Sequence, residues 1–203
     1  MNPALRAGAR WAVHLAALYP LARAIWDFKT GGLTANPIED VTRRAGHAAL
    51  SSLIATLAVS PLVQVSGWKW IAILRRPLGL YSFAYATAHL FIFAGLDYGF
   101  DWALILAEAP KKRFIIAGLA AYIMLAPLAA TSPGSMKLSL GGNWRDIHRL
   151  IYPAALTAGL HFVWLTKGAK TRPMVYLLLI LILLAARAAP GRRPPVSPPL
   201  HDH

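Results

Sequence analysis

Two long runs without charged residues constrain the fold of this chain more than any other feature. Residues 45–68 and 77–96 contain no Asp, Glu, Lys or Arg. A helix needs roughly 20 mostly apolar residues to cross the hydrocarbon core of a bilayer. Each run therefore predicts a membrane-spanning helix. The short alternating segments typical of an outer-membrane barrel are a different pattern.

Similar apolar runs along the chain predict an all-α, polytopic membrane protein with six transmembrane helices in one bundle. The expected spans are about 8–28, 45–66, 77–97, 113–131, 146–166 and 172–188. The apolar segment that follows Arg6 and Arg10 continues to about Phe28, which favours a retained helix over a signal peptide. We assign residues 1–189 to one domain and predict that the proline-rich residues 190–203 form a disordered tail. We expect no internal repeat.

Composition narrows the chemistry that the chain can perform alone. Only 14% of its 203 residues are charged, against about 25% in soluble domains. No separate soluble catalytic domain fits, so flavin, nicotinamide or molybdenum chemistry belongs largely to a partner. The absence of cysteine excludes iron–sulfur clusters and thiolate ligation of heme. The net charge of +13 comes from Lys and Arg residues that lie between the apolar runs. Basic residues at those positions are typical of contacts with anionic lipid headgroups, so nucleic-acid binding is a poor second interpretation.

The distribution of Lys and Arg also predicts an orientation. With the N-terminus inside, the inner segments hold slightly more Lys and Arg than the outer ones, which favours an N-in/C-in arrangement. Four arginines then lie at the inner ends of the third and fifth spans: Arg75, Arg76, Arg145 and Arg149. Guanidinium groups there suit heme propionates, a flavin phosphate or anionic lipid, or simply set the topology. The loops 29–44 and 98–112 lie at the outer face.

Histidines inside the predicted spans are the candidate functional residues. An ionisable group within a bilayer costs several kcal/mol, so an intramembrane histidine marks a functional site by default. His89 and His161 fall at similar outer depths on two different spans. Because neutral imidazole is a good axial ligand for heme iron, we predict that these two residues hold one b-type heme. The alternative for either residue is a structural hydrogen bond.

His148 is harder to place. It precedes His161 by thirteen residues, about 20 Å along one helix, which puts it near the inner surface. The intervening rotation of about 220° puts the two histidines on nearly opposed faces, and Pro153 is expected to kink the helix between them. If His148 binds a heme, its partner ligand could be His14 or a residue other than histidine. The alternative is that His148 is an interfacial histidine in contact with lipid headgroups. His47 is interpreted as interfacial.

Several motifs resemble those of a known family. They are Arg75-Arg76-Pro-Leu-Gly79-Leu before His89, Leu-Ala-Ala-Thr131-Ser132, Trp144-x-x-x-His148-x-x-x-Tyr152 before His161, and the loop GGLTANPIE at 31–39. In order and spacing, residues 11–188 resemble the MsrQ family, heme-binding membrane subunits that belong to the ferric-reductase-like transmembrane domains.

This resemblance implies one or two b-type hemes, and FMN in some members. It also implies electrons from quinol or a flavin reductase, delivered to a periplasmic molybdenum-containing subunit, MsrP, at the bacterial inner membrane. His89, His148 and His161 match the heme ligands, while Arg75, Arg76 and His14 match further cofactor positions less closely. Neither FMN nor quinone leaves a recognisable motif, because no GxGxxG-type loop occurs.

Three functions are therefore open. The first is an electron-transfer subunit of a methionine sulfoxide reductase system, distinct from its catalytic subunit. The second is a stand-alone ferric or quinone reductase that uses the same hemes. The third is a non-redox helical membrane protein whose histidines are structural. The predicted helix interiors hold no acidic residue, which disfavours proton- or cation-coupled transport.

Overall fold

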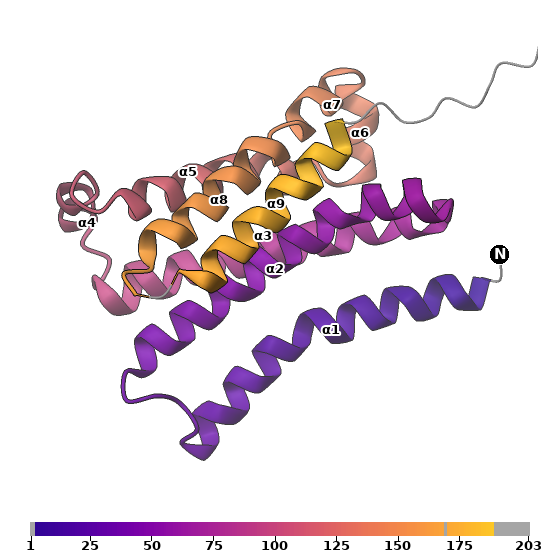
Figure 1. The fold of residues 1–203 in the computed structure, drawn as a ribbon. Coiled ribbons are helices and arrows are strands. Elements are labelled where there is room, and N and C mark those ends of the chain that lie inside the picture. Colours follow the sequence, from indigo (N-terminus) through magenta and orange to yellow (C-terminus); the bar gives the residue numbers. More distant parts are fainter. Residues whose placement is uncertain (1–2, 169, 189–203) are drawn as a thin grey trace, which may run out of the picture.

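The computed structural model describes residues 3–168 and 170–188, and this part of the chain is helical without strands (Figure 1). The predicted all-α class is therefore confirmed over these residues. The long helices are α1 (Pro3–Thr30), α2 (Pro37–Ser66), α3 (Arg75–Ile92), α5 (Arg113–Ala130), α8 (Ile151–Leu165) and α9 (Thr171–Ala188). The short ones are η1 (Lys69–Leu74), the π-helix η2 (Phe93–Asp97), α4 (Trp102–Glu108), α6 (Gly134–Leu140) and α7 (Asn143–His148). The tail 190–203 lies outside the described residues.

The beginning and end of α2 follow from local chemistry. Asn36 caps the first turn, where its side-chain oxygen accepts a hydrogen bond from the Glu39 N–H, and Pro37 takes a position where a missing N–H costs nothing. At the other end, Gly67 adopts the left-handed conformation, with φ of 71°, and donates its N–H to the Val63 carbonyl. The helix thus begins eight residues before the predicted apolar span, with a polar N-terminal extension.

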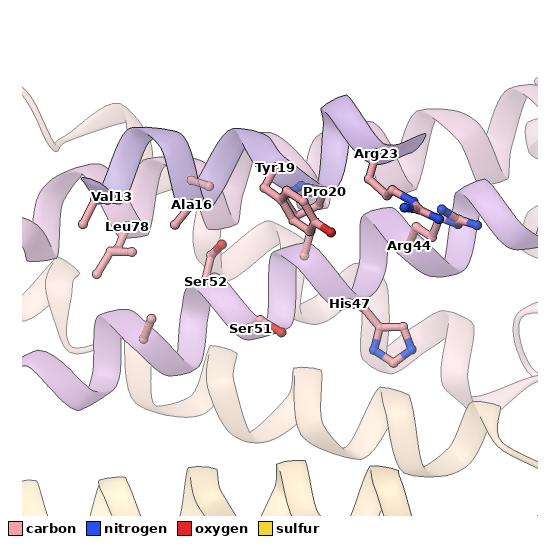
Figure 2. A pocket seen from close by; sticks show the side chains of 13 residues that line it. Val13, Ala16, Tyr19, Pro20, Arg23, Arg44, His47, Ser51, Ser52 and Leu78 are labelled. Carbon is pink, nitrogen blue, oxygen red and sulfur yellow. The ribbon is translucent and has the colours of Figure 1, made fainter. Parts of the chain in front are cut away.

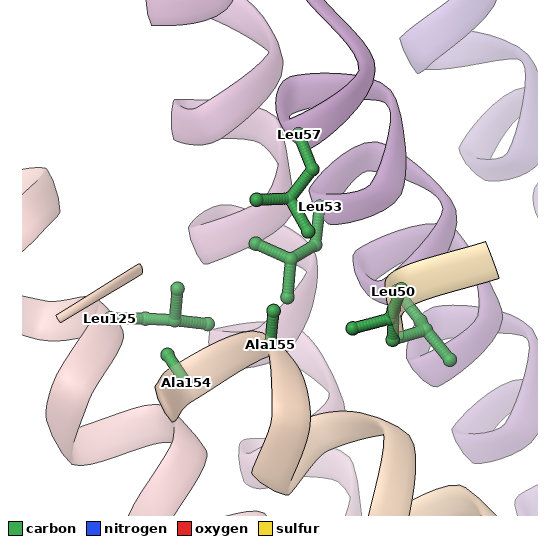
Figure 3. Packing of buried hydrophobic residues seen from close by; sticks show 7 residues of the cluster. Leu50, Leu53, Leu57, Leu125, Ala154 and Ala155 are labelled. Carbon is green, nitrogen blue, oxygen red and sulfur yellow. The ribbon is translucent and has the colours of Figure 1, made fainter. Parts of the chain in front are cut away.

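The helices pack as pairs around a main apolar core, and a smaller buried cluster lies at η2, α4 and the start of α5. The α2 helix packs mainly on α3, and α5 packs mainly on α8, while α9 lies across α8 and α2. The buried core cluster draws on four of these helices: Leu50, Leu53 and Leu57 of α2, Leu125 of α5, Ala154 and Ala155 of α8, and Ile180 of α9 (Figure 3). The α1 helix lies outside this bundle, along α2 and α3 (Figure 1).

The predicted continuous helix over 146–166 is wrong. The chain forms two helices there, α7 and α8, which are separated at Arg149 and Leu150. Pro153 lies in the first turn of α8, where its missing N–H removes no intrahelical hydrogen bond. The proline therefore sits just inside a helix start and does not kink a longer helix. His148 and His161 consequently lie on different helices.

In the part of the chain that the structure describes, three helical segments are long and apolar enough to cross a membrane: Pro37–Ser66, Lys69–Asp97 and Arg113–Ala130. The last of these matches the predicted span at 113–131, and the second includes the predicted span at 77–97. With 15 residues, α8 is only about 22 Å long, which is less than the roughly 30 Å of hydrocarbon in a bilayer. The count of six spans stays a prediction.

A candidate heme site

Two histidines from different helix pairs face each other inside the bundle. His89 lies on α3 and His161 lies on α8. Their ring centroids are 6.0 Å apart, and the two ring planes are inclined by 85°. The structure thus brings together the two residues that the sequence placed at matched depth.

Each imidazole forms the same kind of hydrogen bond with a neighbouring helix. Nδ1 of His89 lies 2.8 Å from the Thr42 carbonyl oxygen of α2, and Nδ1 of His161 lies 2.6 Å from the Phe114 carbonyl oxygen of α5. A carbonyl oxygen only accepts hydrogen bonds, so Nδ1 carries the proton in both rings. Nε2 then retains a free lone pair, which is the tautomer that binds a metal ion.

Glycines make room for both rings. A Cβ at Gly46 would lie 3.1 Å from the His89 ring atoms Nδ1 and Cε1, and a Cβ at Gly118 would lie 2.7 Å from His161 Nδ1. Each glycine is four residues after the residue whose carbonyl accepts the hydrogen bond, and therefore on the same face of the helix. Each histidine can reach its carbonyl because the helix surface beside that carbonyl has no side chain.

The two half-sites belong to an internal repeat, and the expectation of no repeat is wrong. Residues 45–61 read AGHAALSSLIATLAVSP and residues 117–133 read AGLAAYIMLAPLAATSP. They share Ala-Gly-x-Ala-Ala, a leucine four residues later and a closing Ser-Pro. In both halves the histidine follows its carbonyl partner by 47 residues. The pairs α2–α3 and α5–α8 therefore supply one equivalent histidine each.

The distance between the two rings would allow both to bind one iron. Two metal–imidazole bonds of about 2 Å and ring radii of about 1.1 Å add up to a centroid separation of about 6 Å, and the observed separation is 6.0 Å. No group of three or more His, Cys, Asp or Glu residues that could hold a metal ion occurs within residues 3–168 and 170–188. Two imidazoles alone are the ligand set of a heme, whose porphyrin supplies the other nitrogens.

His148 has different surroundings. Its ring stacks on Trp144, with centroids 3.9 Å apart and planes inclined by 28°. Trp144 Nε1 in turn donates a hydrogen bond to the Thr131 carbonyl, which fixes the indole. Nδ1 of His148 is buried and has no hydrogen-bond partner. Since buried polar atoms are nearly always paired, this nitrogen marks His148 as a candidate ligand as well.

Comparison with known proteins decides the family. The family described as "Ferric reductase like transmembrane component" matches residues 6–159. A Rhodospirillum rubrum protein named "Protein-methionine-sulfoxide reductase heme-binding subunit MsrQ" is 40% identical, over 91% of this chain and 89% of its own length. Proteins of the same name from Xanthomonas oryzae pv. oryzae and Xanthomonas axonopodis pv. citri are 40% and 39% identical, over 89% and 94% of this chain and 85% and 95% of their own lengths. The chain belongs to the MsrQ family. No solved structure matches it.

Three further residues that the resemblance to the MsrQ family suggested lie apart from the His89–His161 pair. Nδ1 of His14 lies 2.8 Å from the Tyr81 hydroxyl, between the rings of Trp11 and Tyr81. Arg75 donates a hydrogen bond to Ser60 Oγ, and Arg76 is exposed in the first turn of α3. His14 thus contacts Tyr81 on α3, and Arg75 contacts Ser60 on α2.

Sequence reasoning missed Arg187, near the end of α9. Its guanidinium donates hydrogen bonds of 3.0 Å to the carbonyls of Thr56 and Leu57 on α2. It also lies over the Tyr152 ring, 6.0 Å from the centroid. This arginine ties α9 to α2 at the end of the bundle where α8 begins. Nothing in the sequence around Arg187 separates it from a topology-setting arginine, because its partners are backbone atoms.

A groove of about 490 Å³ lies between α1 and α2 (Figure 2). It is lined mainly by small or apolar side chains, with Arg23 and Arg44 at one end. His47 also contributes to its lining, but its ring packs against Phe162 and Tyr176 on α8 and α9. His89 and His161 do not line this groove, so it is separate from the candidate heme site.

Proposed function

We propose that this chain is a b-type cytochrome subunit that passes electrons to a periplasmic, molybdenum-containing methionine sulfoxide reductase of the MsrP type. The observation that carries the proposal is the pairing of His89 with His161, each with its Nδ1 proton held by a backbone carbonyl. The relatives named as heme-binding subunits of protein-methionine-sulfoxide reductase support both the cofactor and the partner.

The residues of the site have separate tasks in this proposal. Nε2 of His89 and Nε2 of His161 would hold the heme iron. The carbonyls of Thr42 and Phe114 hold each ring in the iron-binding tautomer and fix its orientation. Bound heme supplies a one-electron carrier within the hydrocarbon layer. We assign His148, with its unpaired Nδ1, to a second cofactor position nearer the inner surface.

The direction of transfer follows from the proposed N-in/C-in topology in the bacterial inner membrane. His89 and His161 then lie in the outer half of the membrane, near the connections 31–36 and 98–112. Glu108 and Lys112 form an ion pair in the second connection, and such mixed charge suits a transient encounter with a soluble partner. Electrons enter from the inner side, from quinol or from a flavin reductase. FMN at that side, near Arg75 and Arg76, is part of the proposal.

The first experiment tests the cofactor. The protein is purified after expression with ample heme, and reduced-minus-oxidised spectra and heme per chain are measured. We expect a b-type α-band, and we expect His89→Ala and His161→Ala each to remove the heme that these two residues hold, with a fall in heme per chain, since one remaining histidine does not maintain a low-spin site. His47→Ala is the matched control, because it removes a histidine beside Gly46 that packs on Phe162. Full heme and an unchanged spectrum in both ligand variants would refute the assignment.

The second experiment tests the relay. Protein in oriented vesicles is reduced by quinol or by an internal flavin reductase, and reoxidation of the heme is followed after external addition of MsrP and methionine sulfoxide. We expect reoxidation only when both are present on the outside. Equal reoxidation by methionine sulfoxide without MsrP would indicate a stand-alone reductase. Reoxidation only with internal MsrP would contradict the direction of transfer.

A further inference from the structure

An ion-pair network joins the end of α1 to the start of α2. Nη1 of Arg44 lies 2.6 Å from Asp27 of α1, and Nη2 of Arg44 lies 3.0 Å from Asp40, one turn earlier on α2. Both carboxylates are almost fully buried, with 4% and 3% of their surface exposed. Within residues 3–168 and 170–188, Arg44 is thus the one residue that bridges both acids, and Figure 2 shows it beside Arg23 between the two helices.

Two other arginines contact the same acids from the periphery. Arg23 lies 3.1 Å from Asp27 and Arg43 lies 3.2 Å from Asp40, and each contacts only one of the two acids. Their side chains are 57% and 53% exposed, against 29% for Arg44. Ion pairs with exposed side chains contribute little to stability, whereas a less exposed pair is screened less by solvent. Arg23 pairs within α1 and Arg43 pairs within α2, so among the described ion pairs it is Arg44 that connects the two helices.

The network fixes the segment of α2 that contains the Thr42 carbonyl. Asp40 also accepts a hydrogen bond from the Thr34 N–H, so it ties the loop before the helix to the first turn. Thr42 lies between Asp40 and Arg44, and its carbonyl accepts the Nδ1–H of His89. The first turns of a helix fray most readily because their N–H groups have no intrahelical partners. The ion pairs thus restrain the turn on which His89 depends.

The start of α5, in the second half of the repeat, also carries an ion pair, but Ile116 stands where Arg44 stands in the first half. Lys112 takes the place of Asp40 when the two Ala-Gly segments are aligned, and it lies two residues before Phe114. It forms an ion pair with Glu108 and donates a hydrogen bond of 3.1 Å to the Tyr98 hydroxyl. In both halves, a charged side chain anchors the helix start whose carbonyl holds a histidine. Among the described residues, the bridge between two buried acids occurs beside His89 and not beside His161.

We propose that Arg44, bridging Asp27 and Asp40, is a positioning residue for His89 that acts by fixing the Thr42 carbonyl. The inference rests on the proposed function. A firm Nδ1–H···O=C bond increases the basicity of an imidazole ligand. A more basic ligand stabilises ferric iron relative to ferrous iron and lowers the reduction potential. Loosening the turn weakens that bond, and the potential rises.

Arg44→Gln tests this inference because two effects on the heme potential have opposite signs. Loss of a positive charge alone disfavours reduction and lowers the potential. Loss of positioning raises it. At the wild-type midpoint, we expect the ratio of reduced to oxidised heme in Arg44→Gln to rise at least threefold, which is about 28 mV at 59 mV per tenfold for one electron. The low-spin electron paramagnetic resonance signal of the ferric heme is expected to broaden and shift.

Arg43→Gln and Arg23→Gln are the matched controls, since each removes the same charge from the same acids. We expect their potentials to equal or fall below that of the wild type. Arg44→Lys keeps the positive charge, but the lysine reaches only one of the two carboxylates, so we expect a smaller rise in the reduction potential. If Arg44→Gln does not fold, Arg44→Lys serves as the test variant.

Two outcomes are distinguishable. Wild-type protein without low-spin heme would refute the proposed function. Wild-type heme together with a lowered or unchanged potential in both Arg44 variants would refute only the positioning role.

Discussion

Replacing Gly118 by alanine places a methyl group against one of the two proposed iron ligands. The new Cβ would lie 2.7 Å from Nδ1 and 2.9 Å from Cε1 of His161, against at least 3.4 Å for an ordinary contact. The ring must therefore move by about 0.7 Å, or α5 and α8 must separate by that amount. The ring is held by the 2.6 Å hydrogen bond to Phe114, so any shift strains that bond as well.

The magnitude follows from the cost of overpacking. One extra methyl group in a well-packed interior costs about 1–3 kcal/mol, which corresponds to about 5- to 150-fold in a binding constant. We expect heme affinity in Gly118→Ala to fall by up to this factor, because the ring can move aside in the apoprotein but is held in place once it binds iron. In Gly46→Ala the new Cβ would lie 3.1 Å from His89, so we expect a smaller loss.

Gly79→Ala is the control for the series. Its Cβ would meet Thr56 at 3.7 Å, an ordinary contact, so heme affinity should stay at the wild-type value. All three substitutions favour helix formation by up to about 1 kcal/mol. A loss of heme in Gly118→Ala or Gly46→Ala therefore cannot be caused by a weaker helix.

The assay is heme titration of the apoprotein in detergent, followed by the low-spin absorption spectrum. Equal affinities in Gly118→Ala, Gly46→Ala and Gly79→Ala would refute the reasoning.

Two further predictions concern stability. Hydrogen bonds from Lys112 and then Tyr98 hold the pKa of Glu108 below its usual value of 4.5. The ionised carboxylate therefore stabilises the folded state at pH values above its usual pKa, and this contribution is lost as the pH falls through the folded-state pKa. Glu108→Gln should consequently make the melting temperature decline less steeply below about pH 4.5. Arg187→Met removes two charged hydrogen bonds to α2 carbonyls and should lower the free energy of unfolding by about 1.5–3 kcal/mol. Arg172→Met, at the exposed start of the same helix, should change it by less than about 0.5 kcal/mol in the same thermal unfolding assay.

The apolar pattern predicted the long helices well, because hydrophobic runs of span length permit few other structures. It also placed His89 and His161 at the same depth, since depth depends only on position along each helix. Rotation about the helix axis was harder to predict. The treatment of residues 146–166 as one helix failed because the break at Arg149 and Leu150 has no glycine to mark it, and Pro153 suits a helix start as well as a kink.

The supporting residues of the site carried weaker signals. Gly46 and Gly118 occur in apolar segments where small residues are common, so neither stands out alone. Their signal is the recurrence of Ala-Gly-x-Ala-Ala before a histidine at the same spacing, and a search for repeats with these residues as anchors would have found it. The roles of Arg44 and Arg187 depend on contacts between distant parts of the chain, which no local pattern encodes.

The division of the bundle into two helix pairs has a consequence for how the cofactor site assembles. The carbonyl, glycine and ion pairs that set His89 all precede α4, whereas the carbonyl and glycine that set His161 all follow it. A polypeptide cut within α4 would therefore leave each ligand with its own backbone acceptor and its own glycine, in separate fragments. Formation of the bis-histidine axis then becomes an association between two molecules, whose rate and affinity depend on fragment concentration and on heme.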